Sequence, residues 1–76
     1  MDKDRIAEKL GYEIVNGEFS HAQKIFKHHK KRDYISYDHT SHNGGYWKRA
    51  KSITNLRSSN NNVKSTWDKN LTYKIK

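Results

Sequence analysis

Apolar positions near the start of the chain predict a short helix followed by a brief extended segment. Ile6 and Leu10 are four residues apart, so they lie on one face of a predicted helix over residues 2–10. Acidic residues at its start suit the positive end of the helix dipole, and Gly11 supplies the usual C-terminal stop. Residues 12–15 then form an extended piece that ends at Asn16-Gly17, a strong turn signal.

The next alternation of polar and apolar positions predicts a hairpin. Its strands cover residues 22–29 and 33–38, and successive side chains in the second strand point to opposite faces. A basic tip, made of Lys30, Lys31 and Arg32, connects the two strands. Such a run of positive charge is usually a solvated surface, so we expect the tip to be exposed.

The second half of the chain predicts another helix and another hairpin. After a polar loop, an apolar stripe that contains Trp47 predicts a helix over residues 46–57. The Ser- and Asn-rich residues 58–62 break this helix, and short strands over 63–67 and 71–75 finish the chain. The order helix, hairpin, helix, hairpin predicts an α+β fold with a small antiparallel sheet and two helices.

Composition narrows the class of protein and of partner. The chain has 76 residues, 16 Lys and Arg against 8 Asp and Glu, and a net charge of +8. This length allows one domain over residues 1–76, with an N-terminal helix over 1–11 and an α+β core over 12–76. We expect no membrane-spanning segment and no secretory signal, and the lack of cysteine excludes disulfides and thiolate metal sites. The excess positive charge favours a polyanionic or acidic partner, and nothing indicates a homo-oligomer.

The densest group of reactive residues is the run DHTSHNGGYWK over residues 38–48. Its two glycines allow close approach of a ligand, and the first amides of the predicted helix are donors that a phosphate could use, reinforced by Lys48 and Arg49. These donors predict a phosphate-binding site, the phosphate seat. His42 lies beside it, where an imidazole could move a proton near neutral pH. The alternative is structural: the glycines turn the chain and His42 caps the helix.

A metal site is the competing chemical interpretation of the same run. Asp38, His39 and His42 are close in sequence, and His28 and His29 lie one hairpin away. Adjacent residues of a strand point to opposite sides, so only one of the last two could join a common site. Because a metal site needs three or four ligands with a fixed second shell, we expect no metal and no other cofactor.

RNA fits the basic and aromatic pattern best. Lys64 and Thr66 face one side of a predicted strand. Trp67, like Trp47, is expected to pack in the core, and the alternative for Trp67 is a base-stacking platform. RNA carries its own nucleophile, the ribose 2′-hydroxyl, so its cleavage needs proton transfer and charge stabilisation but no metal-activated water. The residues expected to bind RNA are Arg49, Lys64, Tyr46, Lys30, Lys31 and Arg32.

Two runs of the sequence resemble a known family. The first run is HAQKIFKHHKKRDYISYDHTSHNGGYWKRAKSITNLRS, and the second is STWDKNL. The most specific part of the first run comprises Asp38, the segment 41–45 and Lys48. Over roughly residues 10–71 the chain resembles the novel toxin 21 family, the C-terminal toxin domains of bacterial polymorphic toxins. Those domains end contact-dependent growth inhibition effectors and LXG-type proteins. The chain departs from the family at Ala22-Gln23, where relatives tend to have Gly-Gln, and at the Asn-rich residues 60–62.

The resemblance implies a nuclease, foremost a ribonuclease that cleaves tRNA or other structured RNA. It also implies a small fold like the barnase, EndoU, colicin and RelE group, a cognate acidic immunity protein, and action in the cytoplasm of a target bacterium after export with a larger effector. The residues carried over are His42, Asn43, Lys48 and Thr66, with Asp38, His21 and Gln23 as weaker matches. The predicted catalytic set is these four residues together with His21 as the second proton-transfer group. The alternatives are a metal-dependent DNase that uses Asp38, His39 and His42, and a non-catalytic RNA-binding module.

Overall fold

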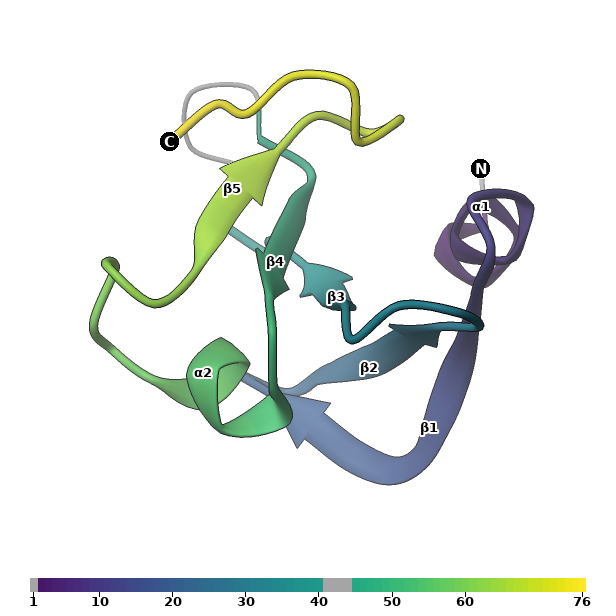
Figure 1. The fold of residues 1–76 in the computed structure, drawn as a ribbon, viewed down its shortest axis with the longest axis horizontal. Helices are drawn as coiled ribbons and strands as arrows, with labels where there is room; N and C mark the ends of the chain where they lie inside the picture. The colour runs from purple at the N-terminus through teal and green to yellow at the C-terminus, as the bar shows by residue number, and fades with distance from the viewer. Residues whose placement is uncertain (1, 41–44) are drawn as a thin grey trace.

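In the part of the chain that the structure describes, five antiparallel strands form one sheet in the order of the sequence, and two helices pack on it (Figure 1). The computed structural model describes residues 2–40 and 45–76. The elements are α1 (Lys3–Lys9), β1 (Tyr12–Ser20), β2 (Gln23–His28), β3 (Tyr34–Tyr37), β4 (Trp47–Ala50), α2 (Ile53–Arg57) and β5 (Ser65–Trp67). The predicted α+β class, with a small antiparallel sheet and two helices, is confirmed.

The first helix forms where the sequence predicts it. The Asp2 side chain caps α1 by accepting a hydrogen bond of 3.0 Å from the Asp4 amide. Gly11 follows the helix with φ at +94°, a conformation that glycine adopts without steric cost. Ile6 and Ala7 are buried against the sheet, so the amphipathic stripe fixes α1 on one of its faces.

The predicted turn at Asn16-Gly17 is wrong, because β1 continues to Ser20. Gly17 has φ at +80° and lies where β1 bulges, since the five steps from Ile14 to Phe19 oppose only two steps of β2. The chain turns instead at His21 and Ala22, whose φ angles of 50° and 66° match a two-residue hairpin turn. Gly17 does mark a break in the regular strand, but the break is a bulge and not the end of the strand.

The predicted helix over residues 46–57 is also wrong in its first half. Trp47–Ala50 forms β4, which pairs with β3 on one side and β5 on the other. The helix begins only at Ile53, after Ser52, whose hydroxyl accepts a hydrogen bond of 3.1 Å from the Asn55 amide. The predicted phosphate seat at a helix start after Gly45 therefore does not exist: the Tyr46 amide donates to the Trp67 carbonyl at 2.8 Å.

The final predicted hairpin is reduced to one short strand. Residues 71–75 form no strand, and their link to β5 is a single bridge between Trp67 and Lys74. Asp68 explains the change, because its carboxylate accepts hydrogen bonds of 2.7 Å from the amides of Thr72 and Tyr73. These bonds curl the chain into a loop and prevent an extended return strand.

Each face of the sheet carries one helix and one apolar cluster. Beneath α1 the cluster contains Phe26, Ile35 and Trp47, and on the other face Leu56 of α2 packs with Ile25 and Ala50 of the sheet. On the α2 side, one row of paired residues runs across the sheet from Ile25 in β2 to Ser36, Lys48 and Thr66 in β3, β4 and β5. Ile25 is the only apolar residue of this row. Directly paired residues share a face, so this row puts a lysine between two hydroxyl side chains beside α2.

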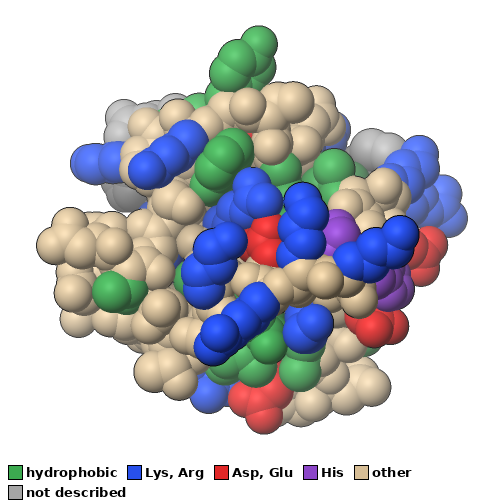
Figure 2. All heavy atoms as spheres, in the orientation of Figure 1, with side chains coloured by type: hydrophobic (Ala, Val, Ile, Leu, Met, Phe, Trp, Pro, Cys, Tyr) green, Lys and Arg blue, Asp and Glu red, His purple; other side chains and the backbone are tan. Residues whose placement is uncertain are grey.

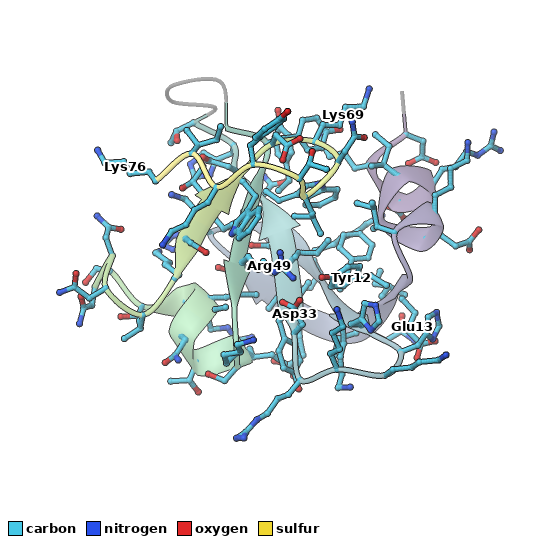
Figure 3. The ribbon with its side chains drawn as sticks, turned by 45° about the horizontal axis from the view of Figure 1, so that its top comes forward. Tyr12, Glu13, Asp33, Arg49, Lys69 and Lys76 are labelled. Carbon is cyan, nitrogen blue, oxygen red and sulfur yellow. The ribbon has the colours of Figure 1, made fainter. Side chains whose placement is uncertain are left out.

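A buried polar network crosses the α1 face. Asp33 accepts hydrogen bonds from the Tyr12 hydroxyl at 2.8 Å and from the Arg49 guanidinium at 2.6 to 3.1 Å. Figure 2 shows Lys and Arg side chains gathered around an acidic side chain in the middle of one face, and Figure 3 shows Tyr12, Asp33 and Arg49 directed toward one another. Burial would raise the pKa of Asp33, but the bonds from Arg49 and Tyr12 outweigh it and the pKa is lowered. The carboxylate therefore stays ionised and joins β1 to β4.

Within residues 2–40 and 45–76, neither helix has the length and apolar character needed to cross a bilayer.

Candidate functional site

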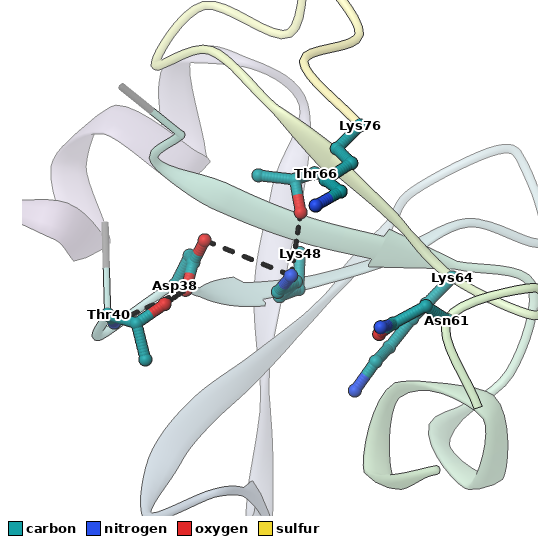
Figure 4. A pocket seen from close by; sticks show the side chains of 7 residues that line it. All are labelled: Asp38, Thr40, Lys48, Asn61, Lys64, Thr66 and Lys76. Carbon is teal, nitrogen blue, oxygen red and sulfur yellow. Dashed lines mark hydrogen bonds and ion pairs between the residues drawn. The ribbon is translucent and has the colours of Figure 1, made fainter. Parts of the chain in front are cut away.

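Lys48 lies at the centre of a polar cleft on the α2 side of the sheet. Its ammonium group donates a hydrogen bond of 2.6 Å to the Thr66 hydroxyl and lies 3.9 Å from a carboxylate oxygen of Asp38 (Figure 4). The Lys48 side chain is 28% exposed and that of Asp38 only 3%. Pairing of β4 between β3 and β5 fixes these positions, so the ammonium is oriented before any ligand binds.

Asp38 is anchored by the segment that follows β3. One of its carboxylate oxygens accepts hydrogen bonds from the Thr40 amide at 3.2 Å and the Thr40 hydroxyl at 2.7 Å. The Asp38 amide in turn donates to the Tyr46 carbonyl at 2.8 Å. Both contacts hold the carboxylate at the floor of the cleft, beside the ammonium of Lys48.

Lys64 supplies a second cation from the segment before β5. Its ammonium donates to the Leu56 carbonyl at 3.5 Å, which ties the lysine to the end of α2. Burial lowers the pKa of Lys64, and the nearby charge of Lys48 lowers it further, while Asp38 acts in the opposite direction. Two ammonium groups near one carboxylate leave this site electropositive and suited to an anion.

The cleft has a volume of about 390 Å³. Its walls come from the segment after β3, from β4 and β5, from the segment between α2 and β5, and from the C-terminal segment. They consist of Asp38, Thr40, Lys48, Asn61, Lys64, Thr66 and Lys76 (Figure 4). Three lysines face a single carboxylate here. The Thr66 oxygen accepts from Lys48, so its own proton can be donated to a bound oxygen.

Two histidines stand at the edge of this cleft. A smaller hollow of about 190 Å³ adjoins it, shares Asp38, Lys48 and Lys64 with it, and is also lined by His21 and His39. The two imidazole rings are nearly parallel, with an interplanar angle of 28° and centroids 6.4 Å apart. The β1–β2 turn and the segment after β3 bring them together, and imidazole is the side chain best suited to proton transfer near neutral pH.

Comparison with known proteins identifies the class of the chain. The model of the novel toxin 21 family matches residues 5–76, nearly the whole sequence. The chain belongs to this family. It is therefore a toxin domain of the polymorphic-toxin type, as the sequence resemblance predicts. No curated protein and no solved structure matches the chain, so its kinship with the barnase, EndoU, colicin and RelE folds stays a prediction.

The toxin domain brings together five of the residues predicted for its site. Lys48, Thr66, Lys64, His21 and Asp38 line the two adjoining hollows, although they come from distant parts of the sequence. The predicted residues His42 and Asn43 lie outside the described residues.

Several predicted RNA-binding residues of the toxin domain lie elsewhere. The Tyr46 ring packs edge-on against Tyr37 and Trp47, each with centroids 5.1 Å away, and burial raises its pKa. Tyr46 therefore packs against the apolar cluster under α1 and is only partly exposed, so its role in stacking stays a prediction. Lys30, Lys31 and Arg32 are exposed as expected, but they precede β3 whereas Asp38 follows it, so a whole strand separates them from the cleft.

Arg49 lies on the opposite face of the sheet from Lys48. The expectation that both reinforce one phosphate seat is wrong, because neighbouring strand residues point to opposite sides. The hydrogen bond to Asp33 raises the pKa of Arg49, and its charge is matched by that carboxylate. Its first role is to stabilise the fold.

Sequence reasoning missed Thr40, Asn61 and Lys76 as parts of the cleft. Thr40 could have been found, since an aspartate side chain often accepts a hydrogen bond from the backbone amide two residues later. Lys76 carries no local signal: its carbonyl accepts from the Thr66 amide at 2.8 Å, a contact made only when the chain folds back on β5. Among the described residues, no group of three or more His, Asp or Glu side chains is placed to hold a metal ion.

Proposed function

We propose that the toxin domain is a metal-independent endoribonuclease that acts on tRNA or another structured RNA. The observation that carries this proposal is the Lys48 ammonium, fixed 2.6 Å from the Thr66 hydroxyl inside a cleft with two further lysines. Such an arrangement fits a phosphodiester, whose oxygens need cationic and hydroxyl donors. The adjoining His21 supplies a group for proton transfer.

The reaction uses the ribose 2′-hydroxyl of the substrate as nucleophile. A base removes the 2′ proton as the O2′–P bond forms, and an acid protonates O5′ as the P–O5′ bond breaks. The products are a 2′,3′-cyclic phosphate and a 5′-hydroxyl. Negative charge builds on the phosphorane between these steps, where a preorganised cation is most effective.

Each residue of the cleft has a role in this scheme. Lys48 stabilises the phosphorane charge, and Thr66 and Lys64 position the scissile phosphate from the β5 side. His21 and His42 are the proton-transfer pair, and Asn43 orients the phosphate. Asp38 holds the Lys48 ammonium in place, since the two groups are 3.9 Å apart.

Incubation of the domain with total tRNA in excess chelator tests the proposal. We expect fragments that end in a 2′,3′-cyclic phosphate. Lys48→Ala should slow cleavage by about 100- to 1,000-fold, the usual effect of removing one charge-stabilising donor. Lys69→Ala is the matched control, because it removes an equal charge from an exposed position outside the cleft.

Three results would contradict the proposal. RNA that stays intact in chelator and is cut after addition of magnesium or zinc requires a metal. Plasmid nicking without RNA cleavage indicates a DNase. Binding of tRNA without cleavage, unchanged by His42→Ala, indicates a non-catalytic RNA-binding module.

We also propose that a cognate acidic immunity protein covers the cleft in the producing cell, and that the free toxin acts in the cytoplasm of a target bacterium. The net charge of +8 favours an acidic partner. A partner that binds only the folded domain adds about 2.7 kcal/mol of stability at a concentration 100 times its Kd. A protein encoded beside the toxin that leaves its thermal midpoint unchanged would count against this partner.

A further inference from the structure

A second hollow lies on the other side of Lys64 from the cleft. Its volume is about 420 Å³, and its lining includes Arg49, Lys51, Lys64, Trp67 and Lys74. Lys64 lines both hollows, so a chain of nucleotides could pass from one into the other without leaving the surface.

Two flat side chains are stacked on each other in this second hollow. The Arg49 guanidinium lies over the Trp67 ring, 4.6 Å from its centroid. The Trp67 indole donates a hydrogen bond of 2.8 Å to the Ser65 hydroxyl, and Arg49 is fixed by Asp33 at 2.6 Å. Both groups are therefore oriented in advance, which lowers the entropy lost when a ligand stacks on them. Unstacked nucleobases bind to such aromatic and guanidinium surfaces.

The charge of the hollow suits a phosphate chain. Arg49 is matched by the Asp33 carboxylate, whereas Lys51 and Lys74 are exposed cations that take part in no ion pair among the described residues. Together with Lys64 they leave a clear positive excess. An acidic protein would use the positive charge but would have no need of the Trp67 and Arg49 pair, so the aromatic floor favours a nucleic acid.

We propose that this hollow is a nucleotide subsite that binds the nucleotide next to the scissile phosphate, with its base stacked against the Arg49–Trp67 pair and its phosphate on Lys51 and Lys74. The proposal rests on the proposed ribonuclease function. Because a base must leave its helical stack to reach Trp67, the subsite selects single-stranded loops of a structured RNA over its duplex parts.

Binding of an uncleavable RNA tests the subsite apart from catalysis. The probe is a labelled single-stranded hexanucleotide with 2′-O-methyl sugars, which lack the nucleophile. Lys51→Ala combined with Lys74→Ala should weaken binding about tenfold and reduce the slope of log K against log salt by roughly 1.4, or 0.7 for each phosphate that is no longer neutralised. The control removes two charges from exposed positions of α1 by Arg5→Ala and Lys9→Ala, and it should bind nearly as the parent does.

Tryptophan fluorescence reports whether the base reaches the proposed floor. Trp47 is fully buried at 0% exposure, so a change on binding comes from Trp67. We expect the hexanucleotide to quench this signal, the Trp67→Phe variant to lose the response, and an abasic hexanucleotide to bind more weakly than the intact one.

The subsite is refuted if the Lys51 and Lys74 double variant binds like the α1 control, if the abasic probe binds as tightly as the intact one, or if polyglutamate quenches Trp67 equally. The last result would assign the hollow to an acidic protein. Failure of the ribonuclease proposal has a different outcome: tRNA would stay intact while the hexanucleotide still quenched Trp67.

Discussion

The Asp33 carboxylate joins β1 to β4, and Asp33→Asn tests how much of the fold depends on it. The substitution keeps the size of the side chain but removes its charge and turns one acceptor oxygen into a donor. That new donor would face the N–H groups of Arg49, which now lie 2.6 to 3.1 Å from the two carboxylate oxygens. The Asp33 side chain is 2% exposed, so water cannot take the place of the lost bonds.

The expected loss is about 2–4 kcal/mol of unfolding free energy. A hydrogen bond to a charged group contributes about 1.5–3 kcal/mol, and breaking a fully buried ion pair costs about 3–5 kcal/mol. The upper value is reduced here because the Arg49 side chain is 24% exposed and can stay partly hydrated. A domain of this size has only about 3–5 kcal/mol from its core, so the variant should be close to unfolded at room temperature.

Thermal unfolding followed by near-ultraviolet circular dichroism measures this loss. We expect the midpoint to fall by roughly 10–25 °C, since 1 kcal/mol shifts a small domain by about 4–8 °C. Glu13→Gln is the matched control, because it removes the same charge from a side chain that is 68% exposed. Equal midpoints for the two variants would refute the role given to Asp33.

The same network predicts the response to acid. The pKa of Asp33 in the folded state is lowered from its ordinary value of 3.8. A lowered carboxyl pKa adds stability that is present above the ordinary value and is lost as the pH falls through the folded value. The parent should therefore lose stability below about pH 4 more steeply than Asp33→Asn, and parallel curves would contradict this linkage.

Three further predictions follow from single contacts. The double variant His21→Asn with Ala22→Gly should gain about 1 kcal/mol of unfolding free energy in urea, because both positions have positive φ angles. The same variant should cleave tRNA more slowly. Unchanged cleavage would remove His21 from the proton-transfer pair. The Lys64→Arg variant should bind the hexanucleotide up to a higher pH than the parent, because burial and, to a lesser extent, the charge of Lys48 lower the pKa of Lys64. Identical curves of binding against pH would contradict this. Gly11→Ala should cost about 1 kcal/mol or more, since φ is +94° and a methyl group would lie 3.1 Å from the His28 ring; an unchanged unfolding midpoint would exclude that clash.

Local signals along the chain were sufficient for part of the fold and of the site. The α1 helix has its own cap and apolar stripe, and the β2–β3 hairpin has its own alternation, so both formed as predicted. The site residues Lys48 and Thr66 were also identified from the sequence, through the family motif. These features depend on residues close together in the chain, where propensity and spacing carry most of the information.

Long-range pairing decided the rest. The apolar stripe of residues 46–57 fits a helix, but burial of Trp47 and Ala50 between β3 and β5 outweighs that local preference. The consequence for the site is large. A helix would present Lys48 and Arg49 on one basic face, whereas a strand sends them to opposite sides of the sheet.

The sequence by itself therefore determined the class of the domain, its positive charge and the kind of side chains available for chemistry. Only the tertiary structure decided which of these side chains meet. Lys48 joins Asp38 and Thr66 in the cleft, and Arg49 joins Asp33 and Trp67 on the other face. The physical reason is that strand pairing, unlike a helix, is set by partners far away in the chain, and a strand alternates its side chains with a period of two.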